Sequence, residues 1–475
     1  MLIPIKKSNL PSSSLNITVF IVFFSICILI SYILATMKVY WVAGTVLAVV
    51  LFTIGFLSPK ISLYILIFSM LLSPEFGARD ISGRGFTFRF EDLLLVIMGF
   101  AWLAKSAIYK NIGLAVRTKL NRPILYYILA CMFATVWGII NGIVSSPLTG
   151  FFFVLKYVEY FIVFFLTINN INSKSDLKNL LVVIFITYVI IIINGFIQIP
   201  RGVRITAPFE GETGEPNTLG GYLIIMLSLN IALFFNVNRV IHKTALGILG
   251  FSCIITILFT LSRASWIGVF GMYISMIFFI KKRHILVLAL IIVGLISPFI
   301  LPDIVINRVL YTFKRTVKTD RMLTRKAQLL LKEKRIGYDM STEARLDQMK
   351  NVLRDIQKRP LLGYGVTGYH FIDAQYHRVL IETGLIGLIA FINLLWVTGS
   401  SINEIRKKYR YDPLYNTLTV GTLAAFIGLL FHCIGTNTFI IVRIMEPFWC
   451  LMGLILAIPI IESVQKPSAR NTIET

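Results

Sequence analysis

The sequence consists largely of apolar runs that are long enough to cross a membrane as helices. A membrane-spanning helix needs about 20 consecutive, mostly apolar residues, and such runs recur from residue 17 to residue 462. With 56% apolar and 15% charged residues and a mean hydropathy of +0.79, the chain cannot fold as an ordinary soluble globule. We therefore predict an all-α, polytopic transmembrane bundle of about 12–14 spans, forming a single integral membrane domain over residues 1–475.

The predicted spans, in chain order, are 17–35, 39–57, 60–73, 92–107, 123–142, 149–168, 178–198, 218–236, 244–261, 264–280, 284–301, 378–398, 417–435 and 443–462. The first run could be read as a signal peptide, but it is long and lacks a small-residue cleavage site. All five cysteines lie inside apolar runs without a CxxC pair, so neither a zinc site nor a disulfide framework is expected.

The basic residues of the short loops predict the orientation of the bundle. Cytoplasmic loops of membrane proteins carry an excess of lysine and arginine. A cytoplasmic N-terminus places six basic segments on that side: Lys105–Arg122, Lys174 with Lys178, Arg239–Lys243, Lys281–His284, Arg406–Arg410 and the C-terminal tail. The external side then receives residues 74–90, 201–217, 261–264, 302–377 and 435–442.

The longest external segment, 302–377, is basic, with fifteen Lys or Arg against eight Asp or Glu. One interpretation of its first part, Lys314–Arg335, is an amphipathic helix that lies on anionic lipid headgroups. From Ser341 onward, apolar residues recur at helical spacing until Pro360, which predicts a second amphipathic helix. We expect this helix to cover the external mouth of a functional site.

The stretch from Ser341 to Leu388 carries a recognisable signature. An arginine precedes the amphipathic helix, the phrase RPLLGYG follows it, and a polar residue before QY leads to LIETGLIGL. This order is similar to the C-terminal signature of the O-antigen ligase and O-antigen polymerase family, with weaker similarity over roughly residues 200–400. The family often has His-Asn where this chain has Asp373-Ala374.

The resemblance implies an inner-membrane glycosyltransferase that acts on the outer face of the cytoplasmic membrane. Its donor would be a polyprenyl-diphosphate-linked oligosaccharide, and its other expected partners are membrane lipids and proteins of polysaccharide export or chain-length control, without nucleic acid. No cofactor is implied. No DxD pair occurs in the chain, so the usual hint of a metal-bound nucleotide-sugar donor is missing and metal independence is expected.

Three arginines are candidate ligands of the donor's diphosphate, because the guanidinium fork pairs with phosphate oxygens and stays charged. Arg263 lies between two apolar runs, where a charge is expensive; alternatively, it reaches the external interface. Arg204 precedes a turn that resembles the family's Arg-to-Pro-Asn segment; alternatively, it is a loop arginine that snorkels. Arg345 matches the family arginine ahead of the amphipathic helix.

The candidate base lies in the sequence GYHFIDAQYHRVL. If the next helix begins near His370, then His370, Asp373 and His377 share one helical face. Asp373 occupies the family's catalytic histidine position, so it would accept the hydroxyl proton or orient a histidine that does. The alternatives are an ordinary polar helix start or a metal site, to which the acidic turn Glu210–Glu215 would be a second, equally weak candidate.

Several alternatives stay open from the sequence alone. Within the family, a polymerase is favoured over a ligase that transfers glycan to lipid A core or protein, because of Asp373 and the long basic segment. An ion or solute transporter is a different class that a many-spanning chain also fits. His432 is interpreted as a satisfied core histidine and Glu382 as a residue that caps or packs the bundle. Glu446, near an external end, is interpreted as structural.

Overall fold

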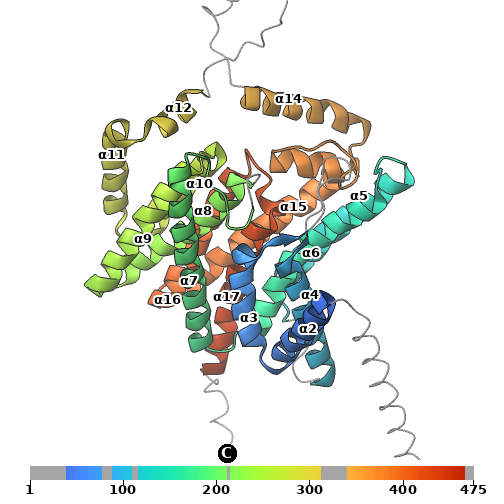
Figure 1. Cartoon of the computed structure of the whole chain (residues 1–475), viewed down its shortest axis with the longest axis horizontal. Helices are drawn as coiled ribbons and strands as arrows, with labels where there is room; N and C mark the ends of the chain where they lie inside the picture. The colour runs from blue at the N-terminus through green and yellow to red at the C-terminus, as the bar shows by residue number, and fades with distance from the viewer. Residues whose placement is uncertain (1–38, 77–87, 110–115, 211–213, 312–339, 466–475) are drawn as a thin grey trace, which may run out of the picture.

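The computed structural model describes residues 39–76, 88–109, 116–210, 214–311 and 340–465 (Figure 1). Two predicted elements lie outside the described residues: the first span, 17–35, and the amphipathic helix expected on lipid headgroups, Lys314–Arg335. Within them the fold is helical, apart from a single two-residue ladder that pairs β1 (Glu75–Phe76) with β2 (Phe88–Arg89). The predicted all-α class is confirmed.

The helices are α2 (Val39–Leu57), α3 (Pro59–Leu72), α4 (Phe90–Ile108), α5 (Asn121–Ile140), α6 (Pro147–Asn170), α7 (Lys174–Gln198), α8 (Pro216–Asn236), α9 (Val240–Phe259), α10 (Arg263–Phe279), α11 (Arg283–Ile300), α12 (Asp303–Tyr311), α14 (Met340–Asp355), α15 (Gln375–Lys408), α16 (Pro413–His432) and α17 (Val442–Gln465), with 3-10 turns η2 (Ile199–Arg201), η3 (Ile356–Lys358) and η4 (Thr438–Ile440). Each of the thirteen predicted spans inside the described residues coincides with one of these helices.

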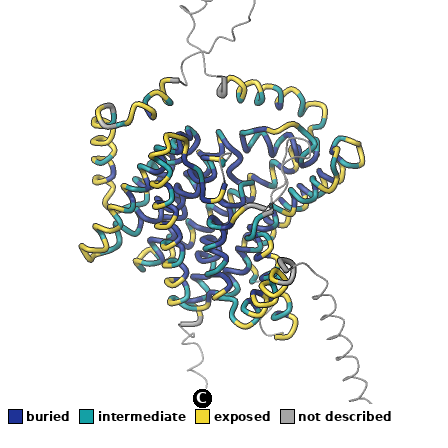
Figure 2. Tube along the Cα trace, viewed as in Figure 1, coloured by how far each residue is buried: buried dark blue, intermediate teal, exposed yellow. Residues whose placement is uncertain are grey.

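Eight of the described helices are long and apolar enough to cross a membrane, and four shorter ones are apolar. Helices α8, α16 and α17 form the centre of the bundle (Figure 2). In the apolar stretch of each helix that could cross a membrane, 78%, 72% and 83% of the residues are buried. Small residues let these helices approach closely. A Cβ on Gly428 of α16 would lie 2.8 Å from Cγ2 of Ile224 on α8, and small residues of this kind are common where membrane helices pack.

The two ends of the bundle separate the segments as the distribution of charge predicted. At one end, Lys119 pairs with Glu404 at 2.5 Å, Lys174 pairs with Asp412, and Arg406 lies over the ring of Phe279. The other end carries the segment 201–210, the turn between α9 and α10, α12, α14 and η4. We call it the loop end; it is at the top of Figure 1.

The amphipathic helix predicted after Ser341 is confirmed as α14, which η3 extends to Lys358. Its apolar side packs on the loop that follows and on α15, through a small cluster of Val352, Ile372 and Ile381. The Tyr369 hydroxyl also donates a 2.8 Å hydrogen bond to Asp355 at the end of α14. Thus α14 is fastened to the bundle at its C-terminal end, while α12 and α14 lie across the loop end (Figure 1).

The sequence motifs RPLLGYG (359–365) and LIETGLIGL (380–388) form one structural unit. Gly384 breaks α15 with φ 67° and ψ −167°, a conformation that is favourable only for glycine. The amides of Leu385 and Ile386 then bond to the carbonyls of Pro360 and Leu361, at 2.8 and 3.3 Å. The loop therefore supplies the acceptors that the interrupted helix cannot.

Candidate functional site

Four arginines from four separate segments lie together at the loop end. Arg204 precedes α8, Arg263 is the first residue of α10, Arg308 is on α12, and Arg345 is on α14. Arg204 donates hydrogen bonds to the carbonyls of Thr260 at 3.1 Å and Leu261 at 3.4 Å. Arg308 donates to the same Leu261 carbonyl, at 3.3 Å. We call these four residues the arginine cluster.

The turn between α9 and α10 holds this cluster together. Leu261 has a positive φ of 50°, which is uncommon for a branched side chain. Ser262 caps α10 by accepting a hydrogen bond from the Ser265 amide. This sharp turn directs two carbonyls at Arg204 and Arg308 and starts α10 with Arg263.

The positive charges of the cluster act on one another. The pKa of Arg204 is lowered, first by burial and then by the nearby charges of Arg308, Arg345 and Arg263, while Glu215 opposes the shift. Neighbouring like charges repel one another unless an anion neutralises them. The cluster is therefore a candidate site for a multiply charged anion.

The sequence singled out three of these arginines but missed Arg308. It lies in the short helix α12, where no motif accompanies it and no neighbouring residue marks it as a ligand. Its partner carbonyl is 47 residues away in the chain. Only the tertiary arrangement brings it to Arg204.

The candidate base Asp373 lies beside the arginine cluster. Its Oδ2 is 3.2 Å from Nε of Arg345, and both side chains are partly exposed, at 35% and 29%. Asp373 therefore combines access from outside with a direct link to one of the candidate diphosphate ligands.

The expected shared helical face of His370, Asp373 and His377 is wrong. Helix α15 begins at Gln375, so only His377 lies on it, and the two other residues precede it in irregular backbone. Tertiary hydrogen bonds hold this backbone out of the helix. Gln375 N donates to the Cys433 carbonyl at 3.2 Å, and the side-chain Nδ2 of Asn437 donates to the Ile372 carbonyl at 2.6 Å.

The two histidines occupy different surroundings. The His370 ring is exposed and lies 4.0 Å from the ring of Tyr369, between centroids. His377 is partly buried, and its Nδ1 is buried without a hydrogen-bond partner among the described residues. An unpaired buried ring nitrogen is unusual, so His377 retains capacity to bind or accept a proton.

A buried polar chain runs from the cluster into the bundle. Ser262 donates to Asn217 at 2.6 Å, Ser265 donates to Ser262 at 2.8 Å, and Ser265 is 3.3 Å from Nε2 of His432. The other ring nitrogen of His432 is 2.8 Å from the Thr438 hydroxyl. His432 is thus the satisfied core histidine that its apolar surroundings predicted.

The buried glutamate of LIETG is also structural, as predicted. Glu382 pairs with Arg378 one helical turn earlier, at 3.2 Å. Its Oε1 also accepts a 3.4 Å hydrogen bond from the Thr367 amide. The pair fixes the loop before α15 against the helix itself.

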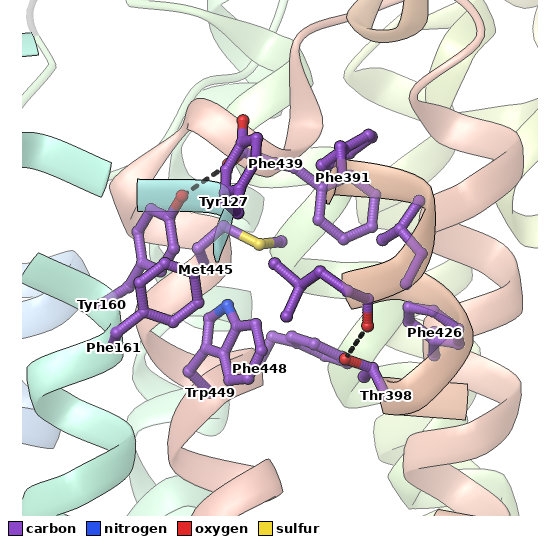
Figure 3. A pocket seen from close by; sticks show the side chains of 12 residues that line it. Tyr127, Tyr160, Phe161, Phe391, Thr398, Phe426, Phe439, Met445, Phe448 and Trp449 are labelled. Carbon is purple, nitrogen blue, oxygen red and sulfur yellow. Dashed lines mark hydrogen bonds between the residues drawn. The ribbon is translucent and has the colours of Figure 1, made fainter. Parts of the chain in front are cut away.

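An aromatic pocket lies inside the bundle between α5, α6, α15, α16 and α17 (Figure 3). Its lining includes Tyr127, Tyr160, Phe391, Phe448 and Trp449. The cavity has a volume of about 10 Å³, which is room for about one water molecule. It is too small for a sugar ring, so the loop end is the better candidate for a glycan.

Among the described side chains, no group of three His, Cys, Asp or Glu residues could hold a metal ion. Glu212, part of one weak metal candidate, lies outside the described residues. Glu210 instead pairs with Arg443 at 3.2 Å and accepts a hydrogen bond from the Glu215 amide at 3.0 Å. Glu210 is therefore held by Arg443.

Residues 248–392 match the family model described as O-Antigen ligase. This segment is an O-antigen ligase family segment. It runs from α9 to the middle of α15 and includes Arg263, Arg308, Arg345 and Asp373, whereas Arg204 lies outside it. No curated protein matches the chain. The match confirms the resemblance that the sequence carries over this segment, in a chain with several helices that could cross a membrane.

Proposed function

We propose that the protein transfers glycan from a polyprenyl diphosphate to an acceptor hydroxyl at the loop end, on the outer face of the cytoplasmic membrane. The observation that carries the proposal is the arginine cluster beside Asp373, of which Arg263, Arg308 and Arg345 lie within the segment that matches the O-antigen ligase model. The acceptor oxygen attacks the anomeric carbon, the bond from that carbon to the diphosphate breaks, and polyprenyl diphosphate leaves.

In this mechanism the arginine cluster binds the diphosphate and stabilises the negative charge that grows on it as the bond breaks. Arg204 and Arg263 are anchored on the bundle, whereas Arg308 and Arg345 come from α12 and α14. Guanidinium groups suit this role because each can donate two parallel hydrogen bonds to phosphate oxygens.

Asp373 accepts the proton of the acceptor hydroxyl, directly or through His370 or His377. In the free protein its carboxylate is paired with Arg345. A bound diphosphate would compete for Arg345 and leave the carboxylate of Asp373 able to accept a proton. Donor binding and base activation would then be linked through this ion pair.

Among the activities of the family, we favour the polymerase, in which the acceptor is a second lipid-linked oligosaccharide. Asp373 stands where the family often has histidine, and the long segment 302–377 carries enough basic residues to bind a second lipid-linked chain. A ligase would instead use lipid A core or a protein as acceptor. Supplying each acceptor separately to the purified protein distinguishes the two.

We expect the purified protein in detergent to lengthen or transfer lipid-linked glycan and to release polyprenyl diphosphate. No membrane gradient is required, because the donor's own phosphate bond drives the reaction. The products are measured by gel electrophoresis of the glycan and chromatography of the lipid. A requirement for sealed vesicles, together with solute uptake, would instead support a transporter.

The orientation of the bundle is testable with two matched positions. Asp347 on α14 and Glu404 on α15 have similar side-chain exposure, 65% and 60%, at opposite ends. We expect Asp347→Cys to react with a membrane-impermeant thiol reagent in intact cells, and Glu404→Cys to react only after lysis. The parent protein is the background control; labelling of Glu404→Cys alone would place the arginine cluster in the cytoplasm.

A further inference from the structure

A second group of charged residues lies inside the bundle, away from the arginine cluster. It comprises Glu91 and Asp92 at the start of α4, Lys156 and Glu159 on α6, and Glu446 on α17. Glu91 and Glu446 are 0% exposed and Glu159 is 8% exposed. Glycan transfer at the loop end uses none of them.

Three of the four carboxylates have identified partners. Lys156 Nζ lies 2.5 Å from Oδ1 of Asp92 and 3.1 Å from Oε2 of Glu159. Glu91 is 3.4 Å from Nη1 of Arg89 and accepts a hydrogen bond from the Ser73 hydroxyl. These contacts offset much of the cost of burying the three carboxylates.

Glu446 differs from the other three carboxylates. Neither of its carboxyl oxygens has a hydrogen-bond partner among the described residues. The charges that act on it from α4 and α6 are Glu91, Glu159, Asp92 and Lys156, three of them negative. An ionised carboxylate in this position would be buried, without a hydrogen bond and repelled by its neighbours, which is strongly unfavourable.

The balance of charge leads to the same conclusion. Four carboxylates in the group face two paired cations, Lys156 and Arg89. Arg443, one turn before Glu446 on α17, is engaged with Glu210, the Pro208 carbonyl and the Ser73 carbonyl. The group therefore lacks positive charge, and carboxyls that share a low-dielectric site commonly retain a proton.

We propose that Glu446 is a buried proton-binding site, which carries its proton at neutral pH in the folded protein. The ligand is a proton and not a metal ion, since the ammonium of Lys156 already lies between Asp92 and Glu159. Ionisable groups within membrane spans are functional candidates by default. This site does not depend on the proposed glycan transfer.

A path of polar groups links Glu446 to the loop end. Glu215 N bonds to Glu210, Glu210 pairs with Arg443, Arg443 bonds to the backbone of Ser73, and the Ser73 hydroxyl bonds to Glu91. The negative charge of Glu91 in turn disfavours ionisation of Glu446. The path couples the charges of the bundle interior to those of the loop end, although no hydrogen bond among the described residues joins it to Glu446.

Infrared spectroscopy of the purified full-length protein tests the proposal, because a protonated carboxylic acid has a carbonyl stretch above the amide band and a carboxylate does not. We expect this band in the wild type at neutral pH and its loss in Glu446→Gln, whose amide replaces the neutral acid with little change in size. Glu462→Gln on the same helix is the matched control and should keep the band, since Glu462 accepts a hydrogen bond from Tyr415. Glu446→Asp retains an acid and should shift the band.

The proposal is overturned if the wild type lacks the band, or if Glu446→Gln retains it. Loss of the band in Glu159→Gln alone would assign the proton to Glu159 and would also overturn it. A second measurement covers the case in which Glu446→Gln folds poorly. If folding takes up this proton, the Tm of the wild type should fall as the pH rises from about 6 to about 8, because the unfolded state binds fewer protons there. A Tm that does not fall over this range would contradict the proposal.

Discussion

The Arg263→Lys variant is expected to turn over lipid-linked glycan about tenfold to about a hundredfold more slowly than the wild type. Lysine keeps the positive charge but loses the second parallel hydrogen bond to the diphosphate, and a hydrogen bond to a charged group contributes about 1.5–3 kcal/mol. The measurement is initial rate of glycan product at saturating donor, with expression and detergent elution profile recorded in parallel.

Arg201→Lys is the matched control for this variant. Arg201 ends η2, three residues before Arg204, and it is exposed. It should retain nearly full activity, whereas Arg204→Lys and Arg308→Lys should both lose activity as Arg263→Lys does. If all four lysine variants were equally active, positive charge alone would explain donor binding, and the hydrogen-bond geometry of the guanidinium groups would not be needed.

The Asp373→Asn variant is expected to lose about a hundredfold to about ten-thousandfold in turnover, as is typical when a well-placed general base is removed. Asparagine has the same size but cannot accept the proton. It also lacks the charge that pairs with Arg345, so donor binding should stay the same or tighten. The expected result is therefore a fall in kcat without a rise in the KM for donor.

Asp347→Asn, on the exposed side of α14, removes a carboxylate in the same segment and should leave kcat unchanged. If Asp373→Asn makes product at a nearly normal rate, Asp373 is not the base. His370→Gln and His377→Gln would then be compared in the same assay. A pH profile that flattens in only one of them would identify the residue that takes the proton.

The positions of the spans could be predicted because a membrane imposes a length and an apolarity on each one. The predicted span 443–462, for example, lies within α17 (Val442–Gln465). The start of α15 could not be predicted. The segment from His370 to Ala374 has no strong helix breaker, and hydrogen bonds to residues 433–437 decide that it is not helical.

The candidate site was predictable only where it carries a local signature. Arg345 and Asp373 belong to the stretch that resembles the family, and the structure pairs them at 3.2 Å. Arg308 has no such signature. That Glu446 has no hydrogen-bond partner among the described residues was not predictable either, because it depends on the side chains that α4 and α6 place around it.

The attachment of α14 has a thermodynamic consequence for the donor. Arg204 and Arg263 belong to the packed bundle, whereas Arg345 is positioned by a helix held mainly through the Val352, Ile372 and Ile381 cluster and the bond from Tyr369 to Asp355. A diphosphate bound both to Arg345 on α14 and to Arg204 and Arg263 on the bundle would act as a cross-link. Its observed affinity would include the free energy of docking α14 on the bundle. A change such as Tyr369→Phe, remote from any phosphate, would then weaken donor binding by lowering the fraction of molecules that are competent to bind.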